Sequence, residues 1–204
     1  MISINIENIK TNLVHIRDLI EDHSPHVIWI QEHWLFKFEQ NFLSEVHPKY
    51  DFAVKSVDEN DPIAPHQRPR GYQGVAILWD KKLPVIKHTV GPEWIQAITI
   101  GEDICILNAY LPCRGSYTDD EFCCEVDKMT HVCNQFAGMH ILLAGDLNVD
   151  LLKHSGRRVL HLKDFLNTQS FKEAQHCPEP TFENSEGHTS KIDYIMSNRR
   201  HESN

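Results

Sequence analysis

Two short apolar runs that stop at acidic residues most constrain what this chain can fold into. Residues 27–30 are Val-Ile-Trp-Ile and are followed within two residues by Glu32; residues 141–144 are Ile-Leu-Leu-Ala and are followed within two residues by Asp146. A continuous apolar run of this length, bounded by polar residues, is typical of a strand buried on both faces. Such strands need covering layers, so we expect a layered fold that holds carboxylates at its strand ends.

Hydrophobic periodicity predicts the other elements. Period-two alternation or short apolar runs indicate strands, and apolar residues at steps of three and four indicate amphipathic helices. Thr118 and Glu121 form a capping box at the start of one helix, and Gly138 is placed to cap its end. Strands are expected at residues 2–6, 52–57, 75–79, 85–90, 95–100, 104–110 and 192–196, helices at residues 9–22, 118–136 and 157–167, and an exposed loop at residues 58–72.

The element pattern predicts a β-rich α/β (α+β) domain. Two mixed β-sheets packed face to face and flanked by helices, a four-layer sandwich, would bury this many strands. With 204 residues, 41% of them hydrophobic and 24% charged, the chain is expected to be one soluble globular domain. No hydrophobic leader or membrane span is apparent, and the six cysteines show no C-x-x-C pair, so we expect reduced thiols in an intracellular protein.

The net charge of −9 argues at first against a nucleic-acid partner, because phosphate binding usually rests on basic residues. Clustered carboxylates can instead be metal ligands, and a bound divalent ion reverses the local field. Basic pairs also remain at Lys81-Lys82, Arg157-Arg158 and Arg199-Arg200. Charge alone therefore leaves the partner open.

Acids and amides at strand ends are the candidate site. Taken singly, Glu32 could be a solvated rim residue, Asp146 and Asn148 part of a turn, and Asp193 the polar face of a strand. Asp146 and Asn148, two residues apart on extended chain, would point the same way, and Gly145 would let a backbone or a phosphate approach closely. Together with Asn5 they supply the hard oxygen ligands that Mg²⁺ or Mn²⁺ prefers, which points to phosphate-ester hydrolysis.

Six sequence blocks occur in the order of the endonuclease/exonuclease/phosphatase superfamily, which the chain resembles over nearly its whole length. They are Ser3-Ile4-Asn5, Ile30-Gln31-Glu32-His33-Trp34-Leu35, Gly74-Val75-Ala76-Ile77, Asn108-Ala109-Tyr110-Leu111-Pro112, Gly145-Asp146-Leu147-Asn148 and Ser190-Lys191-Ile192-Asp193-Tyr194-Ile195. Within the superfamily they look most like the endonucleases of non-LTR (LINE-type) retrotransposons, cousins of apurinic/apyrimidinic endonucleases. The inositol 5-phosphatase branch fits less well, because its Pro-x-Trp-x-Asp-Arg block does not follow Asn148.

The resemblance implies a role for each matching residue. Glu32 would be the principal metal ligand, for Mg²⁺ or Mn²⁺, with Asn5 in the outer environment of the metal. Tyr110 would contact the scissile phosphate, and Asp146 would align and deprotonate the attacking water. The last two roles implied are a bond from Asn148 to a phosphate oxygen and the orientation of a histidine by Asp193.

That histidine is where the chain departs from the family pattern. In the family it lies in a Ser-Asp-His block on a further strand, whereas ten residues follow Tyr194 here. His201 lacks the context of that block, and His188, the nearest histidine before Asp193, is more typical of a surface loop. Residues 1–204 are therefore expected to form a superfamily domain without its C-terminal Ser-Asp-His segment and last strand, with impaired activity.

The resulting expectation is a nuclease that nicks DNA and leaves a 3′ hydroxyl from which a reverse transcriptase, a possible partner in the parent element, could prime. It would be nuclear if it acts on chromosomal DNA; oligomeric state and target preference are not predicted. Two alternatives stay open. The chain could be a non-enzymatic retroelement remnant or incomplete gene product, or a phosphatase or lipid phosphodiesterase of the same superfamily.

Overall fold

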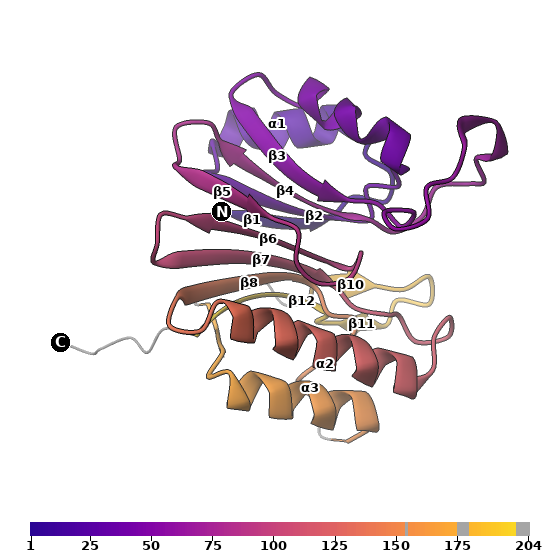
Figure 1. The fold of residues 1–204 in the computed structure, drawn as a ribbon. Coiled ribbons are helices and arrows are strands. Elements are labelled where there is room, and N and C mark those ends of the chain that lie inside the picture. Colours follow the sequence, from indigo (N-terminus) through magenta and orange to yellow (C-terminus); the bar gives the residue numbers. More distant parts are fainter. Residues whose placement is uncertain (154, 175–179, 199–204) are drawn as a thin grey trace.

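The structure is a computed structural model that describes residues 1–153, 155–174 and 180–198 (Figure 1). Cys177, His201 and the pair Arg199-Arg200 lie outside the described residues. The five described cysteines are free thiols. Among the described helices, none has both the length and the apolar content to cross a bilayer.

The first sheet has four strands in the order β1-β2-β4-β3, with β1 parallel to β2 and the other neighbours antiparallel. Its outer face is covered by two helical elements, whose Ile16, Ile20 and Leu43 pack on strand residues such as Ile28 and Ile30. The strands are β1 (Ile2–Asn5), β2 (Val27–Gln31), β3 (Tyr50–Lys55) and β4 (Val75–Asp80), and the covering elements are α1 (Leu13–His23) and the 3-10 helix η1 (Lys37–Glu45).

The second sheet has six strands in the order β5-β6-β7-β8-β12-β9, in which only β7 and β8 are parallel neighbours. Two helices cover its outer face and bury Phe122, Met129 and Leu162 against it. The elements are β5 (Val85–His88), β6 (Ile95–Ile100), β7 (Ile104–Tyr110), α2 (Asp119–Gln135), β8 (His140–Asp146), α3 (Arg157–Thr168), β9 (Lys172–Glu173) and β12 (Asp193–Ser197). A short hairpin of β10 (Phe182–Glu183) and β11 (Thr189–Ser190) precedes β12.

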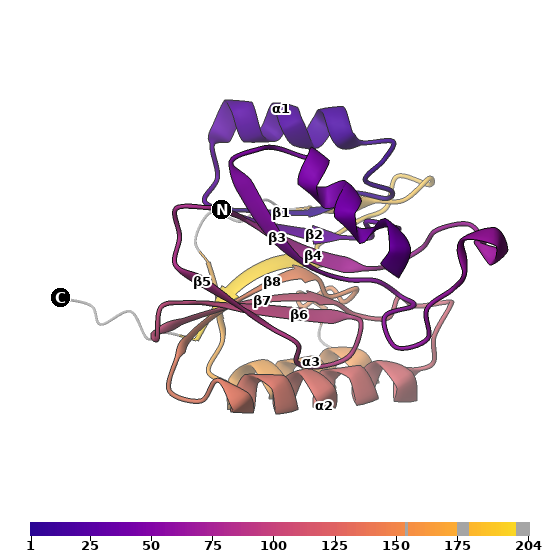
Figure 2. The same ribbon diagram turned by 45° about the horizontal axis from the view of Figure 1, so that its top comes forward.

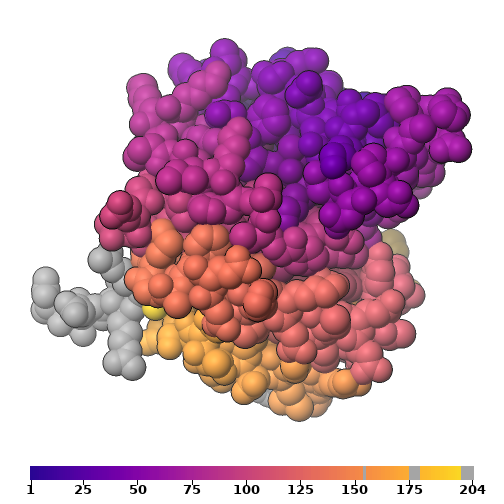
Figure 3. Space-filling view, in the orientation of Figure 1, coloured from indigo at the N-terminus to yellow at the C-terminus, as the bar shows by residue number. Residues whose placement is uncertain are grey.

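The two sheets face each other across a third apolar layer. Trp29 and Ile77 of the first sheet belong to one buried cluster with Ile98 and Ile106 of the second. Figure 2 shows the resulting order of layers, with α1 above the sheets and α2 and α3 below them. Figure 3 shows that the N-terminal part of the chain forms one half of the visible surface and the C-terminal part the other. The expected four-layer sandwich of mixed sheets is confirmed.

Most expected elements are present, and the differences have local causes. The first helix begins at Leu13 and not at Ile9, because the Asn12 side chain donates to the carbonyls of Ile6 and Glu7 and holds a turn there. The η1 helix was not expected. In the loop at residues 58–72, which contains the short helix η2 (Pro65–Gln67), Asp58 is buried and accepts amide hydrogen bonds from Lys37 and Ile63.

The capping box expected at the start of α2 is confirmed, whereas the C-cap of this helix is Phe136 and not Gly138. The Glu121 amide donates to Thr118 Oγ1 at 3.2 Å, and the Thr118 amide donates to Glu121 Oε2 at 2.7 Å. This capping box satisfies amides that the first turn of a helix would otherwise leave unpaired. It fixes where α2 begins and hence the loop that joins α2 to β7.

Candidate active site

Strand direction brings the predicted residues to one end of the sandwich. Asn5 ends β1, Tyr110 ends β7 and Asp146 ends β8, while Glu32 directly follows β2. Because β1 is parallel to β2 and β7 to β8, these carboxyl ends meet at the same edge. β12 runs the other way and begins at this edge with Asp193. All five residues, with Asn148, line a cavity of about 620 Å³, which we call the active-site cavity.

Asn5 joins the two sheets at this cavity. Its Nδ2 donates to Glu32 Oε1 and to Asp146 Oδ2, both at 3.1 Å. Tyr110 donates its hydroxyl to the same Glu32 Oε1 at 2.8 Å. Residues separated by more than a hundred positions in the sequence are therefore in direct contact, and the Glu32 carboxylate is held by donors from both sheets.

Gly145 explains why β8 can lie so close to β7 at the site. Its φ is 145°, and a Cβ built on it would be 1.8 Å from the Ala109 carbonyl oxygen. The structure shows the first of the two reasons expected for a glycine here, the close approach of another backbone. The close approach places Asp146 directly opposite Tyr110 in the parallel pair.

Asp146 is almost completely buried, and its environment disfavours its charge. Burial, with the neighbouring carboxylates of Asp193 and Glu32, raises the pKa of Asp146 to about 7, although hydrogen bonds from Asn5 and from the Asn148 amide act in the opposite direction. A carboxyl group whose pKa lies near neutrality suits proton transfer at physiological pH.

Asn148 reaches the cavity by a different route from the one expected. Its φ is 52°, a left-handed conformation, so the chain is not extended between Asp146 and Asn148. The turn is held by the Asn148 amide, which donates to Asp146 Oδ1 at 2.9 Å, and by Asn148 Nδ2, which donates to the Leu111 carbonyl at 2.9 Å. Both side chains still line the same cavity.

Tyr110 is fixed by stacking as well as by hydrogen bonding. The Trp94 ring lies parallel to it, with centroids 5.6 Å apart and an interplanar angle of 5°. Burial, with the adjacent Glu32 carboxylate, raises the pKa of Tyr110 far above its usual range. The phenol is therefore a neutral hydrogen-bond donor at any physiological pH.

Asp193 lies in the cavity directly opposite Asp146 in the antiparallel β8–β12 pair. Burial raises the pKa of Asp193, although a hydrogen bond with the Thr181 side chain acts to lower it. No histidine in the described part of the chain lines this cavity. His188 is on the exposed β10–β11 hairpin, where its Nδ1 lies 3.5 Å from Glu186 Oε2.

The profile of the Endonuclease/Exonuclease/phosphatase family matches residues 2–203. The chain belongs to this family. Its members are metal-dependent phosphodiester hydrolases. No curated protein matches the chain by sequence.

Solved structures of the family share the fold at low sequence identity. An AP endonuclease from Archaeoglobus fulgidus superposes with a TM-score of 0.71 at 13% identity, covering 97% of this chain and 86% of that one. The endonuclease domain of TRAS1, a telomere-specific non-LTR retrotransposon, gives a TM-score of 0.70 at 13% identity, covering 96% and 82%. A 3′ phosphatase from Neisseria, bound to a product DNA hairpin, gives 0.68 at 14% identity, covering 96% and 85%.

Trp34 is a residue in contact with the candidate site that sequence reasoning missed. Its Nε1 donates to Glu32 Oε2 at 3.1 Å, so both oxygens of the glutamate are held. Glu32 and Trp34 have φ of 56° and 59°, and His33 between them is fully buried. The Glu-His-Trp order contained the signal, but the left-handed turn that brings these two side chains together could not be predicted from it.

One residue of the basic pair Arg157-Arg158, considered above for nucleic-acid binding, has a structural role. Arg158 is 1% exposed; it bonds Asp119 Oδ1 at 2.6 Å and the Pro112 carbonyl at 2.9 Å, and lies over the Phe122 ring. Arg158 is thus unavailable as a free phosphate contact, because its donors fasten the loop after β7 to α2 and α3. Lys81 and Lys82 follow β4 at the end of the sheet away from the site.

Proposed function

We propose that this chain is a divalent-metal-dependent endonuclease that nicks DNA in the manner of a non-LTR retrotransposon endonuclease. The observation that carries the proposal is the single cavity in which Asn5 bridges Glu32 and Asp146, with Tyr110, Asn148 and Asp193 around it. Carboxylates that take a proton, amides that hold an oxygen and a neutral phenol are the groups that phosphodiester hydrolysis requires.

The donor set fits magnesium or manganese. Five carboxylates line the cavity, of which Asp150 pairs with Lys153 at 3.8 Å. Within the described residues, Glu32, Asp146 and Asp193 form no ion pair with a lysine or arginine. The described residues contain no cluster of three or more metal-binding side chains. Mg²⁺ needs no such cluster, because it keeps several waters and is often held by one or two carboxylates.

Glu32 is the residue that would hold the ion, with Asn5 beside it. When bound, the ion would neutralise charge that develops on the phosphate. Glu32 is well prepared for this role, since Tyr110 and Asn5 fix one of its oxygens and Trp34 the other. A prearranged ligand loses less conformational freedom on binding.

Asp146 is the group that would take a proton from the attacking water. The water oxygen forms a bond to phosphorus, its proton moves to Asp146, and the bond from phosphorus to the 3′ oxygen breaks; that oxygen then takes a proton from solvent and becomes a 3′ hydroxyl. Tyr110 and the second amide proton of Asn148 would donate to phosphate oxygens. Asp193 would orient a histidine, and we propose that activity is weak where that histidine is lacking.

Plasmid nicking tests the proposal. We expect purified protein to convert supercoiled DNA to nicked circles only with Mg²⁺ or Mn²⁺, and a DNA polymerase to extend the nick without prior end repair. Asp146→Asn is expected to lower the rate by a factor of about 100 or more. Metal-independent nicking, or equal nicking by Asp146→Asn, would contradict the proposed mechanism.

A nick with a free 3′ hydroxyl suits a reverse transcriptase in the parent element and implies nuclear action if the target is chromosomal DNA. The TRAS1 endonuclease domain shares its fold with this chain at 13% sequence identity. An inactive but folded protein would favour the alternative of a non-enzymatic remnant.

A further inference from the structure

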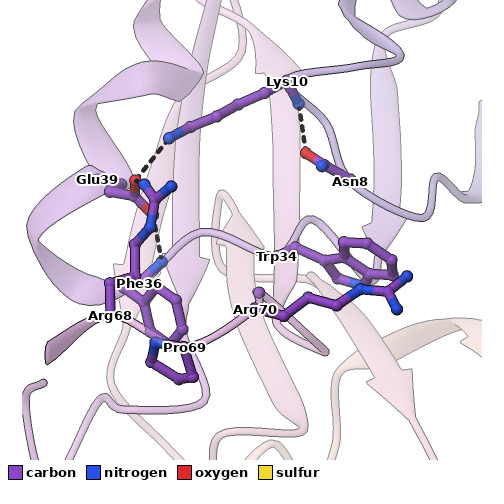
Figure 4. Close-up of a pocket in the computed structure, with 9 residues that line it drawn as sticks. Asn8, Lys10, Trp34, Phe36, Glu39, Arg68, Pro69 and Arg70 are labelled. Carbon is purple, nitrogen blue, oxygen red and sulfur yellow. Dashed lines mark hydrogen bonds and ion pairs between the residues drawn. The ribbon is translucent and has the colours of Figure 1, made fainter.

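A second cavity lies beside the active-site cavity. Its volume is about 390 Å³, and the residues that matter here are Lys10, Trp34, Glu39, Arg68 and Arg70. We call it the basic cavity. Figure 4 shows Lys10, Glu39 and Arg68 grouped on one side of it and Trp34 with Arg70 on the other.

Trp34 connects the two cavities. Its indole Nε1 donates to Glu32 Oε2 at 3.1 Å, and Glu32 lines the active-site cavity. The indole ring itself lines the basic cavity, where the Arg70 guanidinium lies 5.1 Å from the ring centroid. A group bound in the basic cavity would therefore be one side chain away from the candidate metal ligand.

The basic cavity carries an excess of positive charge in a chain whose net charge is −9. Glu39 Oε1 accepts from Lys10 Nζ and from an Arg68 guanidinium nitrogen, each at 2.6 Å. Burial acts to raise the pKa of Glu39, but the hydrogen bonds from Lys10 and from the Phe36 amide, with the charge of Arg68, lower it. Glu39 thus stays charged and holds two cations in place, while Arg70 adds a third.

The cations are both fixed and accessible. The Arg68 side chain is 50% exposed and that of Lys10 38% exposed, so donors remain for a ligand. The guanidinium of Arg70 lies over an aromatic ring, a position in which it can bind a phosphate without losing its contact with the ring. Fixed guanidinium groups beside an aromatic face are typical of surfaces that bind nucleic-acid strands.

We propose that the basic cavity binds a backbone phosphate of the same nucleic-acid strand whose scissile phosphodiester occupies the active-site cavity. The proposal rests on the proposed function and names its substrate class. A polynucleotide presents a phosphate at every nucleotide, so one strand can place one phosphate in each cavity. The basic cavity would thus make the enzyme select polymeric substrates.

Three variants and one control test the proposal by DNA binding alone. Fluorescence anisotropy with a labelled duplex, in EDTA so that no cleavage occurs, gives the affinity between 50 and 200 mM salt. We expect Arg68→Ala and Arg70→Gln to weaken binding several-fold and to reduce the slope of log affinity against log salt by about 1 each. Lys82→Ala, at the other end of the first sheet, should match the unaltered chain.

Glu39→Gln is expected to strengthen DNA binding, a result that misfolding would not produce. The glutamine keeps an oxygen for the Phe36 amide but removes the negative charge, so we expect tighter duplex binding and a steeper salt slope. Unchanged affinity in Arg68→Ala and Arg70→Gln, or a mononucleotide that competes as well as an unlabelled duplex, would overturn the proposal. Because these readouts need no catalysis, absence of nicking would count against the proposed function and leave this test intact.

Discussion

Asp146 and Asp193 lie directly opposite each other on the antiparallel strands β8 and β12, and both line the active-site cavity. Side chains so paired have Cβ atoms about 5 Å apart, and like charges at that separation destabilise a sheet. Burial and Asp193 are the leading causes that raise the pKa of Asp146. The site therefore keeps a pair of acids that destabilises the fold without bound metal.

We expect Asp146→Asn to increase stability in EDTA. The folded-state pKa of about 7 exceeds the ordinary value of 3.8, so the folded state holds a proton that the unfolded state releases. Asp146 therefore costs stability as pH rises through this window, and the full cost applies above about pH 7. Urea unfolding should show a gain of up to about 4 kcal/mol at pH 8 and a smaller one at pH 5. Glu102→Gln, in an exposed turn, is the control; a loss of stability at pH 8 would contradict this reading.

We expect Glu32→Ala to abolish Mg²⁺ binding, because Asn5, Tyr110 and Trp34 hold both oxygens of the Glu32 carboxylate in place at the cavity. Isothermal titration calorimetry on the purified proteins measures the Mg²⁺ affinity directly. Glu7→Gln is a matched control: Glu7 lines the same cavity but is exposed, so salt screens its charge and the affinity should stay within about twofold. Equal affinities of Glu32→Ala and the unaltered chain would remove Glu32 from the metal site.

His33 is expected to make the fold sensitive to acid. Its Nδ1 accepts from the Leu35 amide at 2.9 Å and its Nε2 lies 3.0 Å from the Lys55 carbonyl, so only the neutral ring satisfies both contacts. Burial lowers the pKa of His33 to about 4, against 6.5 for a free histidine. A depressed pKa gives stability that is present above pH 6.5 and lost as pH falls towards 4, by about 3 kcal/mol.

Unfolding free energies of His33→Gln in EDTA isolate this contribution. The variant should be less stable at pH 7 but should lose less stability than the unaltered chain between pH 7 and pH 4. His188→Gln, on the exposed hairpin, should keep the original pH profile. Parallel profiles for His33→Gln and the unaltered chain would show that His33 does not titrate in this range.

The strands and the acids at their ends could be predicted from the sequence because burial leaves a direct pattern of apolar residues. Glu32 and Asp146 were identified in this way, and β-strand direction then brought them together. The contacts that the apolar pattern could not predict depend on backbone turns. Trp34 reaches Glu32 and Asn148 reaches the cavity through left-handed conformations, and period-two reasoning assumes that these do not occur.

Contacts between segments that are distant in the sequence could not be predicted either. Thr181 contacts Asp193 from the segment before the β10–β11 hairpin, and that segment has no hydrophobic period. The basic cavity combines residues that follow β1, β2 and η2 with Glu39 of η1, and only the fold brings them together. Arg158 is the opposite case: the sequence suggested a residue that could contact nucleic acid, whereas the structure buries its side chain.

The last prediction concerns the histidine that Asp193 would orient. A cavity of about 400 Å³ lies between β1 and β12, lined by Ser3, Ile4 and Asn5 on one side and by Asp193 and Tyr194 on the other. Among the described strands β1 pairs only with β2, so its other edge is available to a further strand. A segment that ends in Ser-Asp-His and pairs there would bring an imidazole to Asp193.

We therefore expect that extending the chain with such a segment raises both the melting temperature and the rate of Mg²⁺-dependent plasmid nicking. The same extension with His→Ala should raise the melting temperature alone, because the strand covers the edge of β1 whereas the imidazole contributes only to chemistry. A positioned acid or base typically contributes about 100 to 10,000-fold, so the difference in rate should be large. If the 204-residue chain nicks DNA as fast as the extended one, Asp193 has a role other than orienting a histidine.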